Sequence, residues 1–202
     1  MQPPLHDEWS RFLVFSGFLG KQWNTPLGLQ FRNVEIDFAS PEREIINTIR
    51  NSLLLDPNIR LYTSHMKAVS VIKDDIKLPD HTSEINLETL GEVVIKKSER
   101  DGRTLHIGAD DDVEGNLRNI IMRQFSAFSG GSPNIGVKIL SVKQKKKAIV
   151  KDSGVSNSFL ALRLRFQLRA DPEVHEFILT QGIGHHRKMG FGMMGIMGDS
   201  KR

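Results

Sequence analysis

The chain has 202 residues with a formal net charge of +4, and 39% of them are hydrophobic, enough to build the core of one large domain or two small ones. It contains no cysteine, which excludes disulfides, thiolate nucleophiles and cysteine-based zinc sites. No apolar run approaches the ~20 residues that a membrane span needs, and the N-terminus lacks a signal-peptide pattern, so we expect a folded cytoplasmic protein that does not enter a membrane.

The first half of the chain predicts two strands, a helix and a third strand. Residues 11–18 and 29–38 are typical of strands, and the polar segment 20–28 between them predicts the turn of a hairpin. Ser40-Pro41-Glu42 supplies an N-cap, a proline at the first helical position and an acid in the first turn. The helix should extend to Leu54, with an apolar stripe formed by Ile45, Ile46, Ile49 and Leu53. After a stop at Asp56-Pro57-Asn58, residues 60–72 predict a further strand.

A polar stretch then divides the chain. Residues 73–86 contain Pro79 and show no periodicity. We therefore place a linker at residues 79–89, between an N-terminal domain of residues 1–78 and a C-terminal domain of residues 90–202.

The second half predicts a hairpin over residues 93–97 and 104–109, followed by a helix over residues 113–128. Three aspartates precede this helix and Gly130-Gly131 closes it. A lysine-rich strand or hairpin over residues 135–148 comes before the clearest strand, residues 159–169. A short helix then begins at Asp171-Pro172-Glu173, and a final strand extends to Ile196.

These elements follow the ferredoxin-like order βαββαβ in the second half, with a long strand pair and a short last helix. The first half repeats part of this order, including a Ser-Pro-Glu helix start that matches Asp171-Pro172-Glu173. We predict an α+β fold of two ferredoxin-like domains in tandem, with antiparallel sheets and helices on one face.

The strand at residues 159–169 alternates strictly. Its apolar side chains share one face, and Arg163, Arg165 and Arg169 share the other. A run of lysines that includes Lys145, Lys146 and Lys147 precedes it. Such a run can be a solvated hairpin, but its coincidence with the arginine face favours binding to an RNA backbone.

A glycine-rich loop at residues 182–192 carries the densest candidate site. Glycine permits positive φ and a close backbone approach, so the loop could set amides and cations against phosphates, or it could be a mobile surface turn. It runs from a helix into a strand, which excludes Rossmann and Walker loops, and we expect no nucleotide cofactor. The RNA-binding candidates in the loop are Gly182, Gly184, His185, His186, Arg187, Lys188, Gly190 and Gly192.

In these residues the chain resembles the CRISPR-associated endoribonucleases that cut repeat RNA. These enzymes are members of the repeat-associated mysterious protein superfamily and have two ferredoxin-like domains. The loop, continued by Phe191-Gly192-Met193-Met194 into a strand, is similar to the glycine-rich signature of that family. Residues 53–61, Leu-Leu-Leu-Asp-Pro-Asn-Ile-Arg-Leu, are similar to the stretch that leads into the last strand of its first domain.

The resemblance extends to the N-terminus. Leu5-His6, followed by Arg11 and a strand at residues 12–16, is similar to the catalytic segment of the family, but the strand and helix that usually precede it are missing. We therefore expect a first domain that is incomplete at its N-terminus. Its exposed apolar face would be covered by a second copy or by another subunit of a CRISPR effector complex.

The resemblance also implies the chemistry. The RNA 2′-hydroxyl would attack the adjacent phosphate without a metal, leaving a 2′,3′-cyclic phosphate and a mature guide RNA. His6 would act as general acid or base, and Arg11 or Lys21 would stabilise the transition state. His185 and His186 are alternatives, better suited to contacts with phosphates or bases. We expect no metal site, because these two histidines are adjacent and have no acidic partner at ligand spacing.

Two other functions stay open. A non-catalytic subunit of the same superfamily would use the same loop and basic strand to hold guide RNA in an effector complex. An unrelated ferredoxin-like domain would use them for a small anionic ligand.

Overall fold

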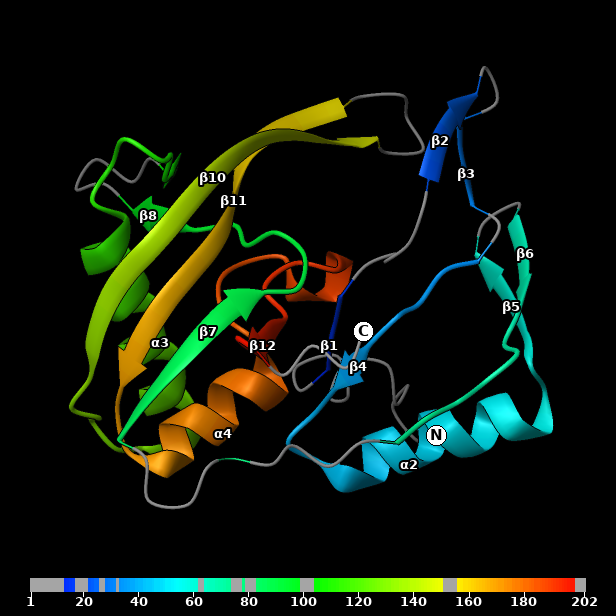
Figure 1. Cartoon of the computed structure of the whole chain (residues 1–202), viewed down its shortest axis with the longest axis horizontal. Coiled ribbons are helices and arrows are strands. Elements are labelled where there is room, and N and C mark those ends of the chain that lie inside the picture. The colour runs from blue at the N-terminus through cyan, green and yellow to red at the C-terminus, as the bar shows by residue number, and fades with distance from the viewer. Residues whose placement is uncertain are drawn as a thin grey trace, which may run out of the picture.

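The computed structural model describes residues 13–16, 22–25, 28–31, 33–61, 64–73, 78, 83–98, 104–150 and 156–198 (Figure 1). Its centre is a four-stranded antiparallel sheet in the order β10-β11-β7-β12. The strands are β7 (Glu84–Thr89), β10 (Gly136–Val150), β11 (Ser156–Arg169) and β12 (Met194–Ile196). Helix α3 (Val113–Ser129) joins β7 to β10, and helix α4 (Pro172–Gln181) joins β11 to β12. This order and neighbour pattern is the ferredoxin-like arrangement that the sequence predicts.

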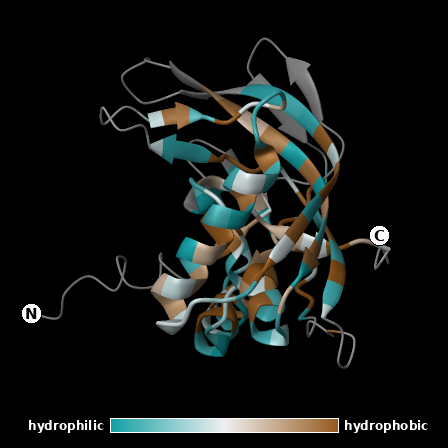
Figure 2. Ribbon diagram, turned by 90° about the vertical axis from the view of Figure 1, so that its left-hand side faces the viewer, coloured by the Kyte–Doolittle hydropathy of each residue, from teal (hydrophilic) through white to brown (hydrophobic). Residues whose placement is uncertain are grey.

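Alternation in β11 determines which face of the sheet the helices cover. Leu162, Leu164, Phe166 and Leu168 are buried in one core with residues of α3 and α4. Apolar and polar residues alternate along the long strands in Figure 2. The opposite face, here called the open face, carries the arginines.

The ends of α3 also follow the sequence signals. The Asp112 side chain accepts a hydrogen bond of 2.9 Å from the Gly115 N–H, which satisfies a free amide of the first turn. Gly130 ends the helix in the left-handed conformation, with φ 74°.

The predicted linker at residues 79–89 is wrong over its second half. Residues 84–89 form β7, which pairs with β11 on one side and β12 on the other. Ile85 and Leu87 are buried while Glu84 and Asn86 are exposed, so the segment alternates as a strand should. The C-terminal domain therefore begins before residue 84, not at residue 90.

The predicted hairpin in this domain is confirmed. It consists of β8 (Lys96–Ser98) and β9 (Thr104–His106), paired antiparallel. It is an insertion between the first strand and first helix of the ferredoxin-like order. Val93 and Val94, expected inside its first strand, instead make isolated bridges to Leu162 and His185.

The first half contains shorter strands than predicted. β1 (Val14–Phe15) pairs with β4 (Phe38–Ala39), and the hairpin of β2 (Gln22–Thr25) and β3 (Gly28–Phe31) lies between them in sequence. Of the predicted pairing between residues 11–18 and 29–38, only the pairing of β1 with β4, at the end of the second segment, is present among the described residues. The predicted turn at residues 20–28 contains strand β2.

Helix α2 (Arg43–Leu55) matches the predicted helix but begins two residues later than Pro41 implied. Glu42 is its N-cap, and the Ser40 hydroxyl accepts a hydrogen bond from the Glu42 N–H instead of capping the helix. The predicted strand at 60–72 is a hairpin of β5 (Asn58–Leu61) and β6 (Ser64–Lys67). No helix in the described part of the chain is long and apolar enough to cross a membrane.

The two halves of the chain meet at β1. Val14 is fully buried in a small core with Ala39, Met193 and the half-buried Leu90. Strand β1 also lies beside the short 3-10 helix η1 (Arg187–Met189), and β4 lies against α4. Strand β1 is thereby held next to the glycine-rich loop.

Candidate nucleic-acid interface

The glycine-rich loop starts where α4 ends and folds back on itself. Gly182 has φ 64°, and the Ile183 N–H donates a hydrogen bond of 2.9 Å to the Gly192 carbonyl. The Gly192 N–H in turn donates to the Glu92 carbonyl at 2.8 Å. A Cβ on Gly182 would lie 2.5 Å from the Gly192 oxygen, so only glycine allows this crossing of the two ends of the loop.

Gly184 is held by a side chain of α3. The Gln124 amide accepts from the Gly184 N–H at 3.2 Å and donates to its carbonyl at 3.0 Å. The next amide, of His185, donates to the Val94 carbonyl at 2.8 Å. The amides of Gly182, Ile183, Gly184, His185 and Gly192 thus all donate to protein acceptors. In this conformation these amides do not face a phosphate, and a ligand would meet the side chains of the loop.

Arg187 points back towards α4. Its Nη1 donates to the carbonyl and to the side-chain oxygen of Gln181, at 2.9 and 3.0 Å. Burial lowers the pKa of Arg187, but an arginine with these two acceptors stays charged. The side chain of Lys188 lies outside the described residues.

His186 stacks at the start of β11. It is the non-glycine residue with positive φ, 60°, within the described ranges. Its ring centroid is 5.6 Å from that of Phe159, and Phe159 is 5.4 Å from Phe191 and 5.9 Å from His106. Burial lowers the pKa of His106, His185 and His186, and the charge of Lys96 lowers it further. These imidazoles are therefore mostly neutral at pH 7.

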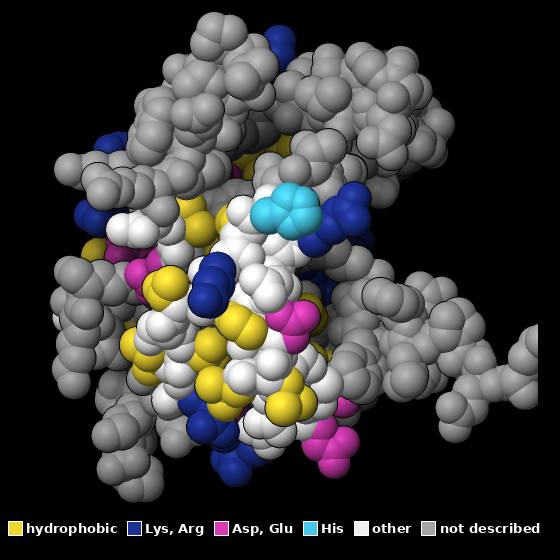
Figure 3. Space-filling model, turned by 90° about the vertical axis from the view of Figure 1, so that its right-hand side faces the viewer, with side chains coloured by type: hydrophobic (Ala, Val, Ile, Leu, Met, Phe, Trp, Pro, Cys, Tyr) yellow, Lys and Arg dark blue, Asp and Glu magenta, His cyan; other side chains and the backbone are white. Residues whose placement is uncertain are grey.

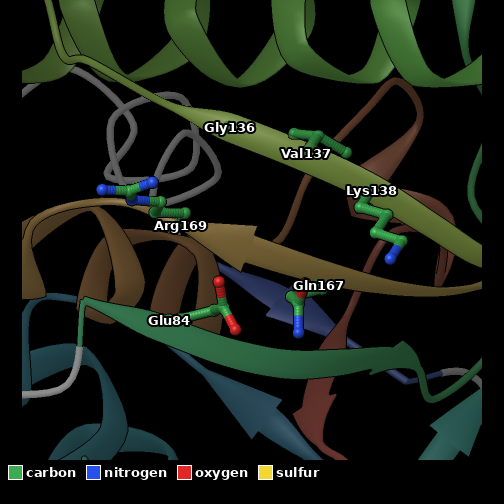
Figure 4. A pocket seen from close by; sticks show the side chains of 6 residues that line it. All are labelled: Glu84, Gly136, Val137, Lys138, Gln167 and Arg169. Atoms are coloured by element: carbon green, nitrogen blue, oxygen red, sulfur yellow. The ribbon is translucent and has the colours of Figure 1, made fainter.

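The open face of the sheet continues from this aromatic group along β11. Odd-numbered residues of the strand follow one another from Phe159 and Ala161, which the loop covers, to the exposed arginines. The predicted orientation of Arg163, Arg165 and Arg169 is confirmed. One shallow hollow of about 190 Å³ lies beside Arg163 and Arg165, and another of about 180 Å³ lies between Arg169, Lys138 and Glu84 (Figure 4).

Carboxylates accompany these cations. Glu88 binds Arg165 at 3.0 Å, and Glu92 lies 3.5 Å from Arg163 and 3.4 Å from Lys145. Glu84 is the cross-strand partner of Arg169. Arg163, Arg165 and Lys145 therefore form a ladder of paired charges with Glu88 and Glu92. Lys138, Lys143 and Lys146 are exposed along β10. The side chain of Lys147 lies outside the described residues.

The predicted catalytic residues His6, Arg11 and Lys21 also lie outside the described residues. The segment that connects them is described at residues 13–16. Ser16 lies against the loop: a Cβ on Gly91 would be 3.0 Å from the Ser16 carbonyl and 3.5 Å from the Gly190 carbonyl. No group of three or more histidine, aspartate or glutamate side chains in the described ranges is placed to hold a metal ion.

Comparison with known protein families shows which family the chain belongs to. The C-terminal model of the CRISPR-associated protein Cas6 family matches residues 74–196. The chain belongs to the Cas6 family. A search of curated proteins gave no match.

Solved structures share the fold of this Cas6-family chain. A Cas6-related protein from Pyrococcus furiosus is 19% identical with a TM-score of 0.73, and the match covers 94% of this chain and 80% of that one. A RAMP protein described as binding different RNA substrates is 20% identical with a TM-score of 0.70, covering 93% and 80%. A CRISPR-associated protein Cas6 is 21% identical with a TM-score of 0.69, covering 92% and 78%. The predicted α+β fold of two ferredoxin-like domains in tandem is confirmed.

Several residues at this Cas6-family interface escaped the sequence reasoning. His106 has no motif around it, yet the inserted hairpin places it on Phe159. Glu88 lies in the predicted linker and Glu92 lies just after it, so the sequence did not predict that they pair with the arginines. An alternation count over residues 84–89 would have revealed β7 and the side of the sheet that Glu88 occupies.

Proposed function

We propose that the chain is a metal-independent endoribonuclease that binds CRISPR repeat RNA and cleaves it to guide RNA. Its membership of the Cas6 family supports a role in CRISPR RNA metabolism. The basic open face and the histidine-bearing loop suit an RNA backbone. We expect it to act in the cytoplasm.

The observation that carries the proposal is the position of β1. Residues 13–16 are the end of the segment that resembles the catalytic segment of the family, and they lie against the glycine-rich loop. The described end of this segment therefore lies beside the loop, which supports a cleavage site where RNA on the basic face would meet the loop.

The chemistry needs a proton acceptor and a cation. His6 would take the proton of the 2′-hydroxyl as its oxygen bonds to phosphorus, or would give a proton to the departing 5′-oxygen. Arg11 or Lys21 would stabilise the extra negative charge on the phosphoryl oxygens. The products are a 2′,3′-cyclic phosphate and a 5′-hydroxyl.

A denaturing gel tests this proposal. CRISPR repeat RNA is incubated with the protein in EDTA, and cleavage to fragments with a cyclic phosphate end is expected. His6→Ala should slow cleavage by about 10²–10⁴-fold with little change in RNA affinity. His65→Ala, on the exposed side of β6, is the control that should cut at the wild-type rate. An equally active His6→Ala protein would refute the assignment of His6.

The second candidate is a guide-RNA-binding subunit that does not cut. The same loop and basic face support it, because both serve binding. A wild-type protein that binds repeat RNA tightly but leaves it intact, with or without magnesium, would favour this function.

We also infer a protein partner, either a second copy or another effector subunit. Apolar side chains gather on the face formed by α2 and the segment after β6 (Figure 3). Leu55 is 88% exposed, Val69 92% and Ile72 78%. A monomer by light scattering that captures no other CRISPR subunit would contradict this inference.

A further inference from the structure

The inserted hairpin brings two cationic or titratable side chains to the glycine-rich loop. Lys96 on β8 and His106 on β9 are directly opposed in the antiparallel pair, so their side chains share one face of the hairpin. The adjoining backbone is joined to the loop through the bridge between Val94 and His185. The hairpin is thereby fixed in register with the loop.

Phe159 connects the hairpin to His186. The His106 and His186 rings contact it at centroid distances of 5.9 and 5.6 Å. Phe159 itself is 5% exposed, whereas both imidazoles are half-buried and keep part of their surface exposed. The two histidines therefore lie on one buried ring, with part of each left for a ligand to contact.

The charges around these imidazoles are of one sign. Lys96 and His106 act on His186, and Lys96 acts on His106. His185, the neighbour in the loop, experiences Lys96, Arg123 and His186. Each of these groups disfavours protonation of the imidazole that it faces, after burial as the larger cause. Once the imidazoles are protonated, the cluster carries positive charge only, and a bound anion would offset the repulsion within it.

We propose that Lys96, His106 and His186 form a subsite that binds one phosphate group of RNA and tightens as the two imidazoles take up protons. This subsite rests on the proposed RNA-binding function. It assigns to the inserted hairpin a role in RNA binding, and it extends the interface from the loop to β8 and β9.

The proton linkage has a definite sign. The free imidazoles have pKa values below 6.5, so both are neutral at pH 7.5. A bound phosphate raises the pKa of each imidazole. At a pH between the pKa of the free protein and that of the complex, RNA binding is therefore accompanied by proton uptake. Affinity therefore rises as pH falls, by at most a factor of ten per pH unit for each proton.

Filter binding at constant ionic strength tests the subsite. The probe is a 2′-O-methylated repeat RNA, which binds without undergoing 2′-hydroxyl attack. The variants are His106→Gln, His186→Asn and their combination; asparagine is chosen because it tolerates the positive φ of residue 186. His65→Gln, exposed on β6, is the matched control for the loss of one imidazole.

We expect the RNA affinity of wild type and of His65→Gln to be at least about fivefold higher at pH 6.0 than at pH 7.5. The affinity of the double variant should rise by about twofold or less over the same pH change. The NMR pKa values of His106 and His186 in the wild type should also rise on RNA binding, which needs no variant. A pH response that persists unchanged in the folded double variant, or pKa values that do not move, would overturn the subsite. Absence of RNA binding at both pH values would overturn the proposed function itself.

Discussion

Gly192 and Gly130 have similar positive φ values, 82° and 74°, but different surroundings. A Cβ on Gly192 would overlap the Ile183 carbonyl oxygen, whereas a Cβ on Gly130 would meet nothing within 4 Å. Gly192 is required both by its positive φ and by its close approach to Ile183, whereas Gly130 is required by its positive φ alone. This pair separates the two reasons for glycine within one protein.

We expect Gly130→Ala to cost about 1 kcal/mol through its backbone conformation. Gly192→Ala should cost about 3 kcal/mol or more, because it also displaces the hydrogen bond from Ile183 to residue 192. At about 2–4 °C per kcal/mol, the melting temperatures should fall by about 3 °C and by more than about 6 °C. Equal falls in circular dichroism melts would show that the Ile183 contact relaxes at no cost.

Single residues were predictable where their role depends on local sequence. Asp112 caps the start of α3 because its carboxylate accepts a hydrogen bond from a free amide of the first turn. Gly130 ends the helix because glycine, without a side chain, adopts the left-handed conformation readily. His106 acquires its importance from Phe159, more than fifty positions away, and no local pattern records that contact. The same holds for Gln124, which binds Gly184 across the core.

At the scale of elements, Glu88 on β7 and Glu92 just after it form the charged ladder with basic residues of β11 and β10. Glu88 contacts Arg165, and Glu92 lies between Arg163 and Lys145. An RNA phosphate that binds these cations must replace a carboxylate. The ladder therefore lowers the attraction for RNA in general.

We expect the double variant Glu88→Gln, Glu92→Gln to bind RNA about threefold to tenfold more tightly at 150 mM salt, and unrelated RNA to gain as much as repeat RNA. The slope of log affinity against log salt should steepen by about 0.7 for each phosphate newly contacted. The double variant Glu173→Gln, Glu176→Gln, at two exposed positions of α4, makes the same change in net charge without touching the ladder. If this control gains as much, net charge alone explains the effect.

Elements were predictable where one strong period extends over many residues. Strand β11 alternates over its whole length, and α3 has a continuous apolar stripe with caps at both ends. The short strand β7 alternates too, but its charged residues and the neighbouring Pro79 favoured a linker. The hairpin of β5 and β6 has no Asn-Gly or Asp-Gly turn, so residues 60–72 resembled a single strand.

At the scale of the whole molecule, β1 joins the N-terminal half to the glycine-rich loop. Val14 is fully buried among Ala39, Met193 and Leu90, so it packs β1 and β4 against the residues that follow the loop. This contact could not be predicted from sequence, because a two-residue strand has no period. The tandem ferredoxin-like fold could be, from the order of elements and the resemblance to a family.

Val14→Ala should cost about 2 kcal/mol of stability by leaving a cavity, and lower the melting temperature by about 4–8 °C. If His6 is catalytic, cleavage of repeat RNA below the transition should slow by about tenfold with unchanged affinity, because small displacements of a reacting group are costly. Val69→Ala, at a 92% exposed position, should alter neither quantity. Unchanged cleavage in a destabilised Val14→Ala protein would separate β1 from the reaction.

Strand β10 is an outer strand of the four-stranded sheet, and its free edge could recruit a strand from another molecule. The Ile139 N–H at the irregular point of this edge donates to the Glu114 carboxylate of α3 at 3.1 Å, which removes one exposed donor. Farther along, Lys143, Lys145 and Lys146 are exposed and repel the same residues of a second chain. The lysines that we propose to contact RNA should therefore also protect the protein from aggregation. Replacing them with neutral residues would reduce RNA affinity and solubility together.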